Sequence, residues 1–326
     1  MSRRGQLLAA GAAGLVGAGL LGAGAVAIKA RRRTRDAARD GAITSAERIT
    51  STVAPDTAGH RGGSGTPLLL LHGISVTWRT WKPILPLLEP RHDVIAPTLL
   101  GHSGAAPLAD GVAPSLDSLV DGVVAELDAL GLDRVHVVGN SLGGWIALEL
   151  ARRGRARSVV ALSPAGAWRS TVRMSLLGAG MRLGVDLTDG MGDRLERLAH
   201  SPRGRRLLLA NIVAHPERYD PNELVADIRA IRHAPVVRPL LRVIADSPLR
   251  PLPDPGCPVR VVWGREDRVI PFRQYGKPLV ERVPSAELIM LDDVGHVPMS
   301  DAPDTVARLI LEVTGAVDRG GVQATG

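Results

Sequence analysis

The sequence contains few aromatic residues and only one cysteine. Phe, Trp and Tyr together make up 2% of its 326 residues, so aliphatic side chains must dominate any core that it buries. The single cysteine, Cys257, excludes a disulfide framework and a metal site built from cysteines. The nine histidines show no H-E-x-x-H pattern or other ligand spacing. We therefore predict neither a bound metal nor another cofactor.

The formal net charge of +7 comes from one end of the chain. Residues 1–35 contain seven basic residues and no acidic one, so the remaining 33 basic residues balance the 33 acidic residues. The rest of the chain is therefore neutral overall. It gives no electrostatic reason to expect a nucleic-acid partner.

The N-terminal segment also contains the longest uncharged run. Residues 7–28 contain no charged side chain and could span a bilayer, although many of them are Gly or Ala. Two arginines precede the run and five basic residues follow it within residues 29–35. We predict that residues 1–36 form an uncleaved anchor, which places the protein at a bacterial cell membrane through residues 7–28.

Two other interpretations of this segment stay open. Ser2-Arg3-Arg4 resembles a twin-arginine start and Ala25-Val26-Ala27 a cleavage site, as in an exported protein. A flexible soluble tail is the third hypothesis. The excess of basic residues after the run favours a cytoplasmic domain, whereas the twin arginines favour export, so the orientation stays open.

From about residue 43 onward, short apolar runs alternate with amphipathic segments. Runs rich in Val, Ile and Leu and bounded by turn residues are typical of strands buried on both faces. They occupy residues 68–71, 93–96, 135–138, 158–162, 259–263 and 287–291. Helical periodicity predicts one helix after Ser115, a second after Ser141, and a last one that begins near Pro303 and ends at Gly315. This alternation predicts an α/β fold with a doubly wound, mostly parallel sheet.

One long stretch interrupts the alternation. Residues 167–254 contain helical pieces separated by prolines and no convincing strand. This stretch is too long for a loop between two strands of one sheet, so we predict an inserted helical cap. The predicted organisation is a core in two parts, 43–166 and 255–314, with the cap between them and a flexible tail at 315–326.

A candidate nucleophile lies where one predicted strand meets a helix. The strand at 135–138 leads directly into Gly139-Asn140-Ser141-Leu142-Gly143, and helical periodicity starts at once. G-x-S-x-G alone is a weak signal in a chain with 37 glycines. A turn this tight, however, forces Ser141 into a strained conformation and exposes its hydroxyl, while larger residues in place of Gly139 and Gly143 would collide. The start of the helix also stabilises developing negative charge, and we predict that Ser141 is a nucleophile.

With this turn the sequence resembles the α/β-hydrolase family. Three further segments share the resemblance: residues 71–74 (LHGI), 261–271 (VVWGREDRVIP) and 294–303 (VGHVPMSDAP). The resemblance implies an α/β-hydrolase fold with a helical cap. The segment GHSG at 101–104 is a looser match, and it leaves His102 and Ser103 without an assigned role.

The resemblance also implies the roles of the matching residues. Asp267 matches the acid of a catalytic triad, and His296 matches the base that takes the proton of Ser141. The backbone N–H groups of Ile74 and Leu142 match the two donors of an oxyanion hole.

Some neighbouring residues fit these motifs less well. Glu266 and Asp254 lie near Asp267 in the sequence, but neither stands at the matching position. Asp301 stands where the family usually has glutamate. We expect His72 to be structural, and Asn140 receives no role.

A serine nucleophile on this fold implies acyl transfer to Ser141 followed by hydrolysis. We predict cleavage of a carboxylic ester, as in carboxylesterases and lipases. A carbon–carbon bond hydrolase of ring-fission products is the alternative, because such relatives share the pattern G-N-S-x-G-G. An acyltransferase or perhydrolase could use the same triad, and a non-catalytic ligand-binding protein is a further hypothesis. Epoxide hydrolases and dehalogenases of the family place aspartate at the nucleophile position, which disfavours both.

The predicted cap indicates the kind of substrate. Apart from its glycines and charged residues it is rich in Leu and Met, including Met174, Leu176, Leu177, Met181, Leu207, Leu208 and Leu209. If the cap covers the site, a small apolar acyl ester is a better substrate than a charged one.

Overall fold

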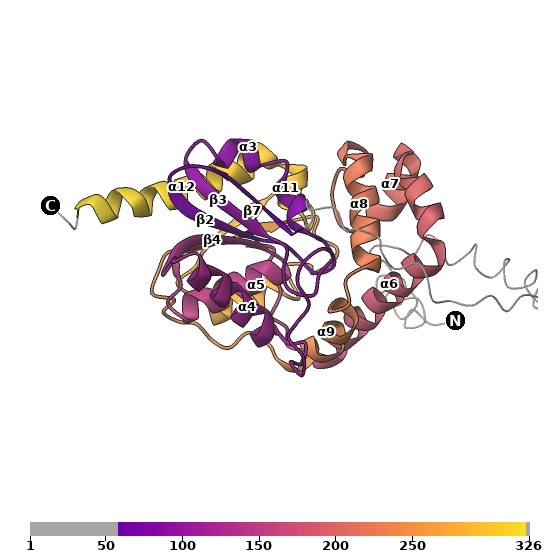
Figure 1. Cartoon of the computed structure of the whole chain (residues 1–326), viewed down its shortest axis with the longest axis horizontal. Coiled ribbons are helices and arrows are strands. Elements are labelled where there is room, and N and C mark those ends of the chain that lie inside the picture. Colours follow the sequence, from indigo (N-terminus) through magenta and orange to yellow (C-terminus); the bar gives the residue numbers. More distant parts are fainter. Residues whose placement is uncertain (1–57, 324–326) are drawn as a thin grey trace, which may run out of the picture.

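The computed structural model describes residues 58–323 and contains a central seven-stranded sheet (Figure 1). The strands are β1 (Gly59–Gly63), β2 (Thr66–Leu71), β3 (His92–Pro97), β4 (Val135–Asn140), β5 (Ala156–Leu162), β6 (Val259–Gly264) and β7 (Glu287–Leu291). Their order in the sheet is β1-β3-β2-β4-β5-β6-β7. Every neighbouring pair is parallel except β1 and β3. The predicted α/β fold with a mostly parallel sheet is confirmed.

Strand β1 was not predicted, because it lacks an apolar run. Its sequence is Gly-His-Arg-Gly-Gly, and it pairs antiparallel with β3 at the edge of the sheet. Arg61 of β1 forms an ion pair with Asp93 of β3, with 2.7 Å between Nη2 and Oδ2. Backbone pairing and surface charges, rather than buried side chains, therefore define this strand.

Helices cover both faces of the sheet (Figure 1). Helices α4 (Leu116–Ala129) and α5 (Leu142–Arg152) pack on one face, and α3 (Leu85–Leu88) and α12 (Pro303–Gln323) pack on the other. Alternate residues of β2 point to opposite faces of the sheet. Leu69 and Leu71 belong to the hydrophobic cluster with α4 and α5, and Leu68 and Leu70 belong to the cluster with α3 and α12. The remaining helical pieces of this part are the 3-10 helix η2 (Trp78–Trp81), α10 (Gly276–Arg282) and α11 (Pro298–Asp301).

The segment between β5 and β6 contains helices and no strand, and all of it lies within the described residues. Its elements, here called the cap helices, are α6 (Thr171–Ala199), α7 (Pro202–Leu209), η3 (Pro216–Arg218), α8 (Pro221–Arg232), α9 (Val237–Val243) and η4 (Ile244–Asp246). They lie together beyond one end of the sheet (Figure 1). Each of α6, α7 and α8 begins at a Ser or Asp whose side chain accepts a backbone N–H bond. The position fits the predicted cap, whose exact limits stay a prediction.

The predicted end of the last helix at Gly315 is wrong. Helix α12 continues to Gln323, so residues 315–323 do not form the flexible tail that the sequence favoured. Asp318 explains the extension, because its carboxylate accepts hydrogen bonds from Thr66 Oγ1 at 2.9 Å, Arg157 Nη2 at 3.0 Å and His136 Nε2 at 3.1 Å. These contacts join the end of the helix to three strands, and the glycine does not end the helix.

The predicted membrane anchor at residues 7–28 lies outside the described residues. Within residues 58–323, no helix has both the length and the apolar character needed to cross a bilayer.

The Asp318 contacts make a testable contribution to stability. Replacing Asp318 with Asn removes the charge that binds Arg157 and His136, and we expect the free energy of unfolding to fall by about 1–2 kcal/mol. Urea denaturation followed by circular dichroism measures this loss. Asp246→Asn, at an exposed position of η4, is the matched control and should leave the midpoint unchanged. Equal midpoints for both variants would show that Asp318 does not hold the end of α12.

Candidate active site

Ser141 lies at the sharp turn between β4 and α5. Its backbone has φ 54° and ψ −112°, a conformation that side-chain-bearing residues rarely adopt. A Cβ at Gly139 would overlap the carbonyl oxygen of Gly143, and a Cβ at Gly143 would overlap that of Leu71. The steric requirement for glycine on both sides of Ser141 is therefore met in the structure.

His296 and Asp267 meet in a buried hydrogen bond. Asp267 Oδ2 lies 2.8 Å from His296 Nδ1, and Asp267 is 3% exposed. The other oxygen, Oδ1, accepts the backbone N–H groups of Val269 at 3.0 Å and Ile270 at 2.9 Å. These donors fix the carboxylate, so Nδ1 of the imidazole faces Asp267 and Nε2 is left for other chemistry.

The alternative acids do not reach His296. Glu266 is exposed and pairs with Arg268 at 3.2 Å. Asp254 is also exposed, and its side chain accepts the N–H of Gly256. Of the three acids, only Asp267 contacts the imidazole.

Asn140, to which the sequence assigned no role, joins the two loops of the site. Its Nδ2 donates to the carbonyl oxygen of His296 at 2.9 Å and to that of Leu162 at 3.1 Å. The residue beside Ser141 therefore holds the backbone of His296 directly. Its position next to Ser141 was visible in the sequence, but its long-range partner was not.

Asp301 holds the His296 loop from the other side. Its carboxylate accepts the N–H of Gly295 at 2.8 Å, and also those of Ala214 at 2.9 Å and His215 at 3.1 Å. The last two residues lie between α7 and α8, so one side chain joins the loop to the cap helices. Asp301, which stands where the family usually has glutamate, therefore holds the His296 loop in this chain.

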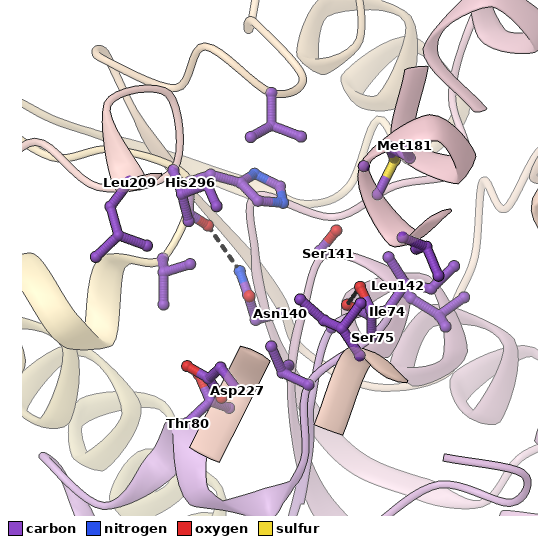
Figure 2. Close-up of a pocket in the computed structure, with 18 of the residues that line it drawn as sticks. Ile74, Ser75, Thr80, Asn140, Ser141, Leu142, Met181, Leu209, Asp227 and His296 are labelled. Carbon is purple, nitrogen blue, oxygen red and sulfur yellow. Dashed lines mark hydrogen bonds between the residues drawn. The ribbon is translucent and has the colours of Figure 1, made fainter. Parts of the chain in front are cut away.

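Ile74 and Leu142 border the site, and the role of their N–H groups as an oxyanion hole stays a prediction. Leu142 is the first residue of α5, so its N–H has no acceptor within the helix. Both residues line the same cavity as Ser141. Figure 2 shows Ile74 and Leu142 beside Ser141, with the ring of His296 on the other side.

His72 is structural, as expected. It bonds through Nδ1 to the carbonyl oxygen of Gly73 at 2.7 Å, and its Nε2 accepts the N–H of Leu99 at 2.9 Å. Burial, with a smaller contribution from nearby His102, holds the pKa of His72 well below its usual range. Burial also lowers the pKa of His102 to about 4. Both rings are therefore neutral at neutral pH, and His72 fixes the loop that carries Ile74.

Ser141 and His296 line one cavity of about 210 Å³ under the cap helices (Figure 2). The apolar side chains that the cap helices contribute include Met174, Leu177, Met181, Leu208 and Leu209. Leu176 and Leu207 instead face solvent. Five of the seven apolar residues singled out in the predicted cap thus line the cavity.

The Ser141 hydroxyl and the His296 ring share this cavity, but within residues 58–323 no hydrogen bond joins them. No cluster of three or more His, Cys, Asp or Glu residues that could hold a metal occurs in the described part of the chain.

Comparison with known proteins identifies the family. Residues 68–309 match the model of the alpha/beta hydrolase family. The chain belongs to this family. The match begins within β2, spans β3 to β7 and includes the cap helices, Ser141, Asp267 and His296.

Members of the family with different names resemble this chain. It is 38% identical over 199 residues to epoxide hydrolase EphH of Mycobacterium tuberculosis, covering 59% of this chain and 91% of that protein. It is 29% identical over 260 residues to 2-hydroxymuconate semialdehyde hydrolase of a Pseudomonas species, covering 73% and 82%. It is 31% identical over 254 residues to the pimeloyl-[acyl-carrier protein] methyl ester esterase of Aromatoleum aromaticum, covering 76% and 97%. The three are all hydrolases, but their names give three different kinds of substrate.

A buried carboxyl group in the cavity predicts a pH-dependent stability. The pKa of Asp227 is raised to about 7, mainly by burial. The Tyr219 hydrogen bond and the charge of Arg79 oppose this rise, whereas the charge of Glu223 adds to it. When folding raises the pKa of a carboxyl group, the folded state loses stability as the pH rises from the pKa of the unfolded chain to the pKa of the folded protein. Each unit of pKa difference corresponds to about 1.4 kcal/mol.

We therefore expect Asp227→Asn to raise the melting temperature at about pH 8. The difference in melting temperature between the variant and the unchanged protein should shrink as the pH falls toward about 4. Asn can still accept the Tyr219 hydroxyl bond. Differential scanning calorimetry across this range measures the effect. Asp193→Asn, at an exposed position of α6, serves as the control. A difference that does not change with pH would contradict the raised pKa.

Proposed function

We propose that the protein is a serine hydrolase that cleaves carboxylic esters. The observation that carries the proposal is the buried hydrogen bond between Asp267 and His296, whose ring lines the same cavity as Ser141. In this arrangement His296 takes the Ser141 proton, and Asp267 stabilises the imidazolium that forms. The N–H groups of Ile74 and Leu142 bind the oxyanion. The acyl group is transferred to Ser141, and water activated by His296 releases the acid.

The walls of the cavity support an ester with an apolar acyl group. Met and Leu side chains of α6 and α7 form much of the surface beneath the cap helices. An apolar chain would be desolvated there at no cost, whereas an unpaired charge would be strongly disfavoured. The similarity to a methyl ester esterase over most of both chains agrees with this substrate class.

The similarity to an epoxide hydrolase suggests a different reaction, the opening of an epoxide. Attack on an epoxide by Ser141 would form an ether between the enzyme and the substrate. Water activated by His296 has no carbonyl to attack in an ether, so the enzyme could not be regenerated. Attack on an ester forms a new ester on Ser141, which water can hydrolyse. The serine therefore favours acyl chemistry over epoxide opening.

The second candidate is hydrolysis of a carbon–carbon bond in a ring-fission product. It is favoured by the similarity to 2-hydroxymuconate semialdehyde hydrolase and by the sequence Gly-Asn-Ser-Leu-Gly-Gly at residues 139–144. The apolar cavity counts against an acidic substrate of this kind. An acyltransferase, a perhydrolase and a ligand-binding protein without turnover stay further alternatives on the same fold.

Labelling and turnover test the proposed nucleophile. We expect a fluorophosphonate probe to label the full-length protein and the protein to hydrolyse p-nitrophenyl esters. Ser141→Ala should abolish labelling and lower kcat by about 10⁴-fold or more. Ser103→Ala, at a serine outside the cavity, is the matched control and should still be labelled. Labelling that survives in Ser141→Ala would exclude Ser141 as the nucleophile.

The choice of substrate then separates the candidate reactions. A series of p-nitrophenyl esters of increasing acyl length distinguishes an esterase from a lipase-like enzyme. A vinylogous diketo acid tests carbon–carbon cleavage, and styrene oxide tests epoxide opening. Activity on the diketo acid with none on any ester would reject ester hydrolysis in favour of the second candidate.

We also propose that residues 7–28 attach the protein to a membrane, on the basis of their uncharged sequence and basic flanks. The full-length protein should sediment with membranes and be released by detergent but not by high salt. A variant without residues 1–36 should appear in the aqueous fraction. Intact mass after expression in a bacterium separates an anchor, which keeps the segment, from an export signal, which loses it. A full-length protein that stays in the aqueous fraction would contradict attachment.

A further inference from the structure

The cavity contains more polar groups than the proposed triad needs. The polar side chains that line it, besides Ser141 and His296, belong to Ser75, Thr80, Asn140, Thr188, Tyr219 and Asp227. Polar groups in an apolar pocket orient a ligand when their hydrogen-bonding capacity is not already used. The partners of each group therefore show which of them are available to a substrate.

Three of these groups are already bonded to the backbone. The hydroxyl of Ser75 donates to the carbonyl oxygen of Ile74 at 2.6 Å. That of Thr188 donates to Val185 in its own helix, also at 2.6 Å. Asn140 donates to two carbonyl oxygens, as described above. Each of these contacts holds part of the protein rather than a ligand.

Asp227 retains an available oxygen. The Tyr219 hydroxyl donates to Oδ2 at 2.7 Å, and among residues 58–323 no donor reaches Oδ1. The side chain lines the cavity although Asp227 is only 9% exposed. Taking such a group out of water costs free energy unless its hydrogen bonds are replaced. The carboxyl group of Asp227, a residue that lines the cavity, thus keeps one acceptor oxygen without a partner among the described residues.

The hydroxyl of Thr80 is available in the same part of the cavity. Thr80 is in η2, and its neighbour Arg79 holds Glu223 of α8 by two hydrogen bonds of 2.9 and 2.8 Å. Lys82 adds a third contact to Glu223, at 2.8 Å. Since Asp227 lies one helical turn after Glu223, these contacts place it near Thr80. Figure 2 shows Thr80 and Asp227 on the opposite side of Ser141 from Met181.

We propose that Asp227 and Thr80 together bind a hydroxyl group of the substrate, at a distance from the bond that is cleaved. This inference rests on the proposed function and specifies its substrate as an apolar ester that carries a hydroxyl group. The substrate hydroxyl donates to Asp227 Oδ1 and exchanges a second hydrogen bond with Thr80. Tyr219 is a positioning residue, because it orients the carboxyl group through Oδ2.

A hydroxyl group fits this position better than a charged group. Because the pKa of Asp227 is about 7, both of its forms are present near neutral pH, and a hydroxyl can donate to one and accept from the other. A substrate carboxylate would repel the ionised form. An ammonium group needs three acceptors, and Arg79 and Lys82 already supply positive charge beside Glu223.

Matched pairs of esters test the proposal on the full-length protein. One pair is p-nitrophenyl hexanoate and p-nitrophenyl 6-hydroxyhexanoate, and the second pair carries the hydroxyl on the alcohol, as butyl and 4-hydroxybutyl hexanoate. The readout is the ratio of kcat/KM for the hydroxylated ester to kcat/KM for its parent. We expect the unchanged protein to prefer the hydroxylated ester in at least one pair, and Asp227→Leu to lower that ratio by about tenfold or more.

Conservative variants separate recognition from folding. Thr80→Val keeps the shape of the side chain and should lower the same ratio by a few fold. Asp227→Asn keeps a hydrogen-bonding group and should retain part of the preference. Thr188→Val removes a cavity hydroxyl that is bonded to its own helix, and it should leave the ratio unchanged. Equal ratios for Asp227→Leu, Thr188→Val and the unchanged protein would overturn the proposal, as would a preference for aminated over hydroxylated esters.

A binding measurement distinguishes failure of this proposal from failure of the proposed function. Calorimetry on Ser141→Ala compares the affinities of hexan-1-ol and hexane-1,6-diol, which need no turnover. Tighter binding of the diol that is lost in Ser141→Ala/Asp227→Leu would support the hydroxyl site even if no ester is hydrolysed. Hydrolysis of simple esters without any preference for the hydroxylated member, in turnover or binding, would reject the hydroxyl site and leave the ester proposal intact.

Discussion

The close packing of backbone at residues 139–144 is the constraint on which the site depends. Ser141 keeps its strained conformation, at a cost of about 1–3 kcal/mol, because β4 and the first turn of α5 leave no space for another arrangement. Gly139 allows β4 and α5 to approach each other, Gly143 allows α5 to approach the backbone of Leu71 at the end of β2, and Gly144 makes room for Pro164. Every residue from Leu142 to Ala151 is buried, and the burial of this helix offsets the local strain. The position of the Ser141 hydroxyl is thus set by the core of the protein.

The other groups of the candidate site are fixed relative to this turn by hydrogen bonds between loops. The carboxyl ends of parallel strands meet at one edge of the sheet, so the loops after β4, β6 and β7 converge there. Asn140 then bonds the backbone of His296, and His296 bonds Asp267. A shift of any one loop would break a buried hydrogen bond in its neighbour. The relative positions of Ser141, Asp267 and His296 therefore depend on all the loops at this edge of the sheet.

Local patterns in the sequence were sufficient for most of the fold. Six strands, the main sheet helices and the turn at Ser141 follow from apolar runs, helical periodicity and glycine spacing, all of which act over a few residues. Two of the features that were missed depend on distant partners. Strand β1 has no apolar run and depends on pairing with β3, and α12 passes Gly315 because Asp318 bonds three strands.

Local sequence patterns also predict only part of the candidate site. The motifs around Ser141, Asp267 and His296 are short, so the sequence could place them on loops at the ends of strands. The function of Asn140 and Asp301 lies in contacts with residues far along the chain, which no local pattern indicates. Asp227 is a stronger example, since an acidic residue in an amphipathic helix usually faces water. Only the packing of α8 against α6 in three dimensions shows that this one lines the cavity.

The arrangement separates the proposed chemistry from the choice of substrate. Ser141, Asp267 and His296 all belong to the sheet and its loops, whereas Asp227 and the Met and Leu residues above Ser141 belong to the cap helices. Several contacts join the parts. They include the bonds of Asp301 to the backbone of Ala214 and His215, the bond of the His296 N–H to the carbonyl oxygen of Ile212 at 2.7 Å, and the contacts of Arg79 and Lys82 with Glu223. Replacing a cap residue that faces the cavity can change which ligand fits while those contacts and the sheet edge stay in place. Members of one family can therefore act on different substrates with the same core, and in this chain the cap helices are where such differences would arise.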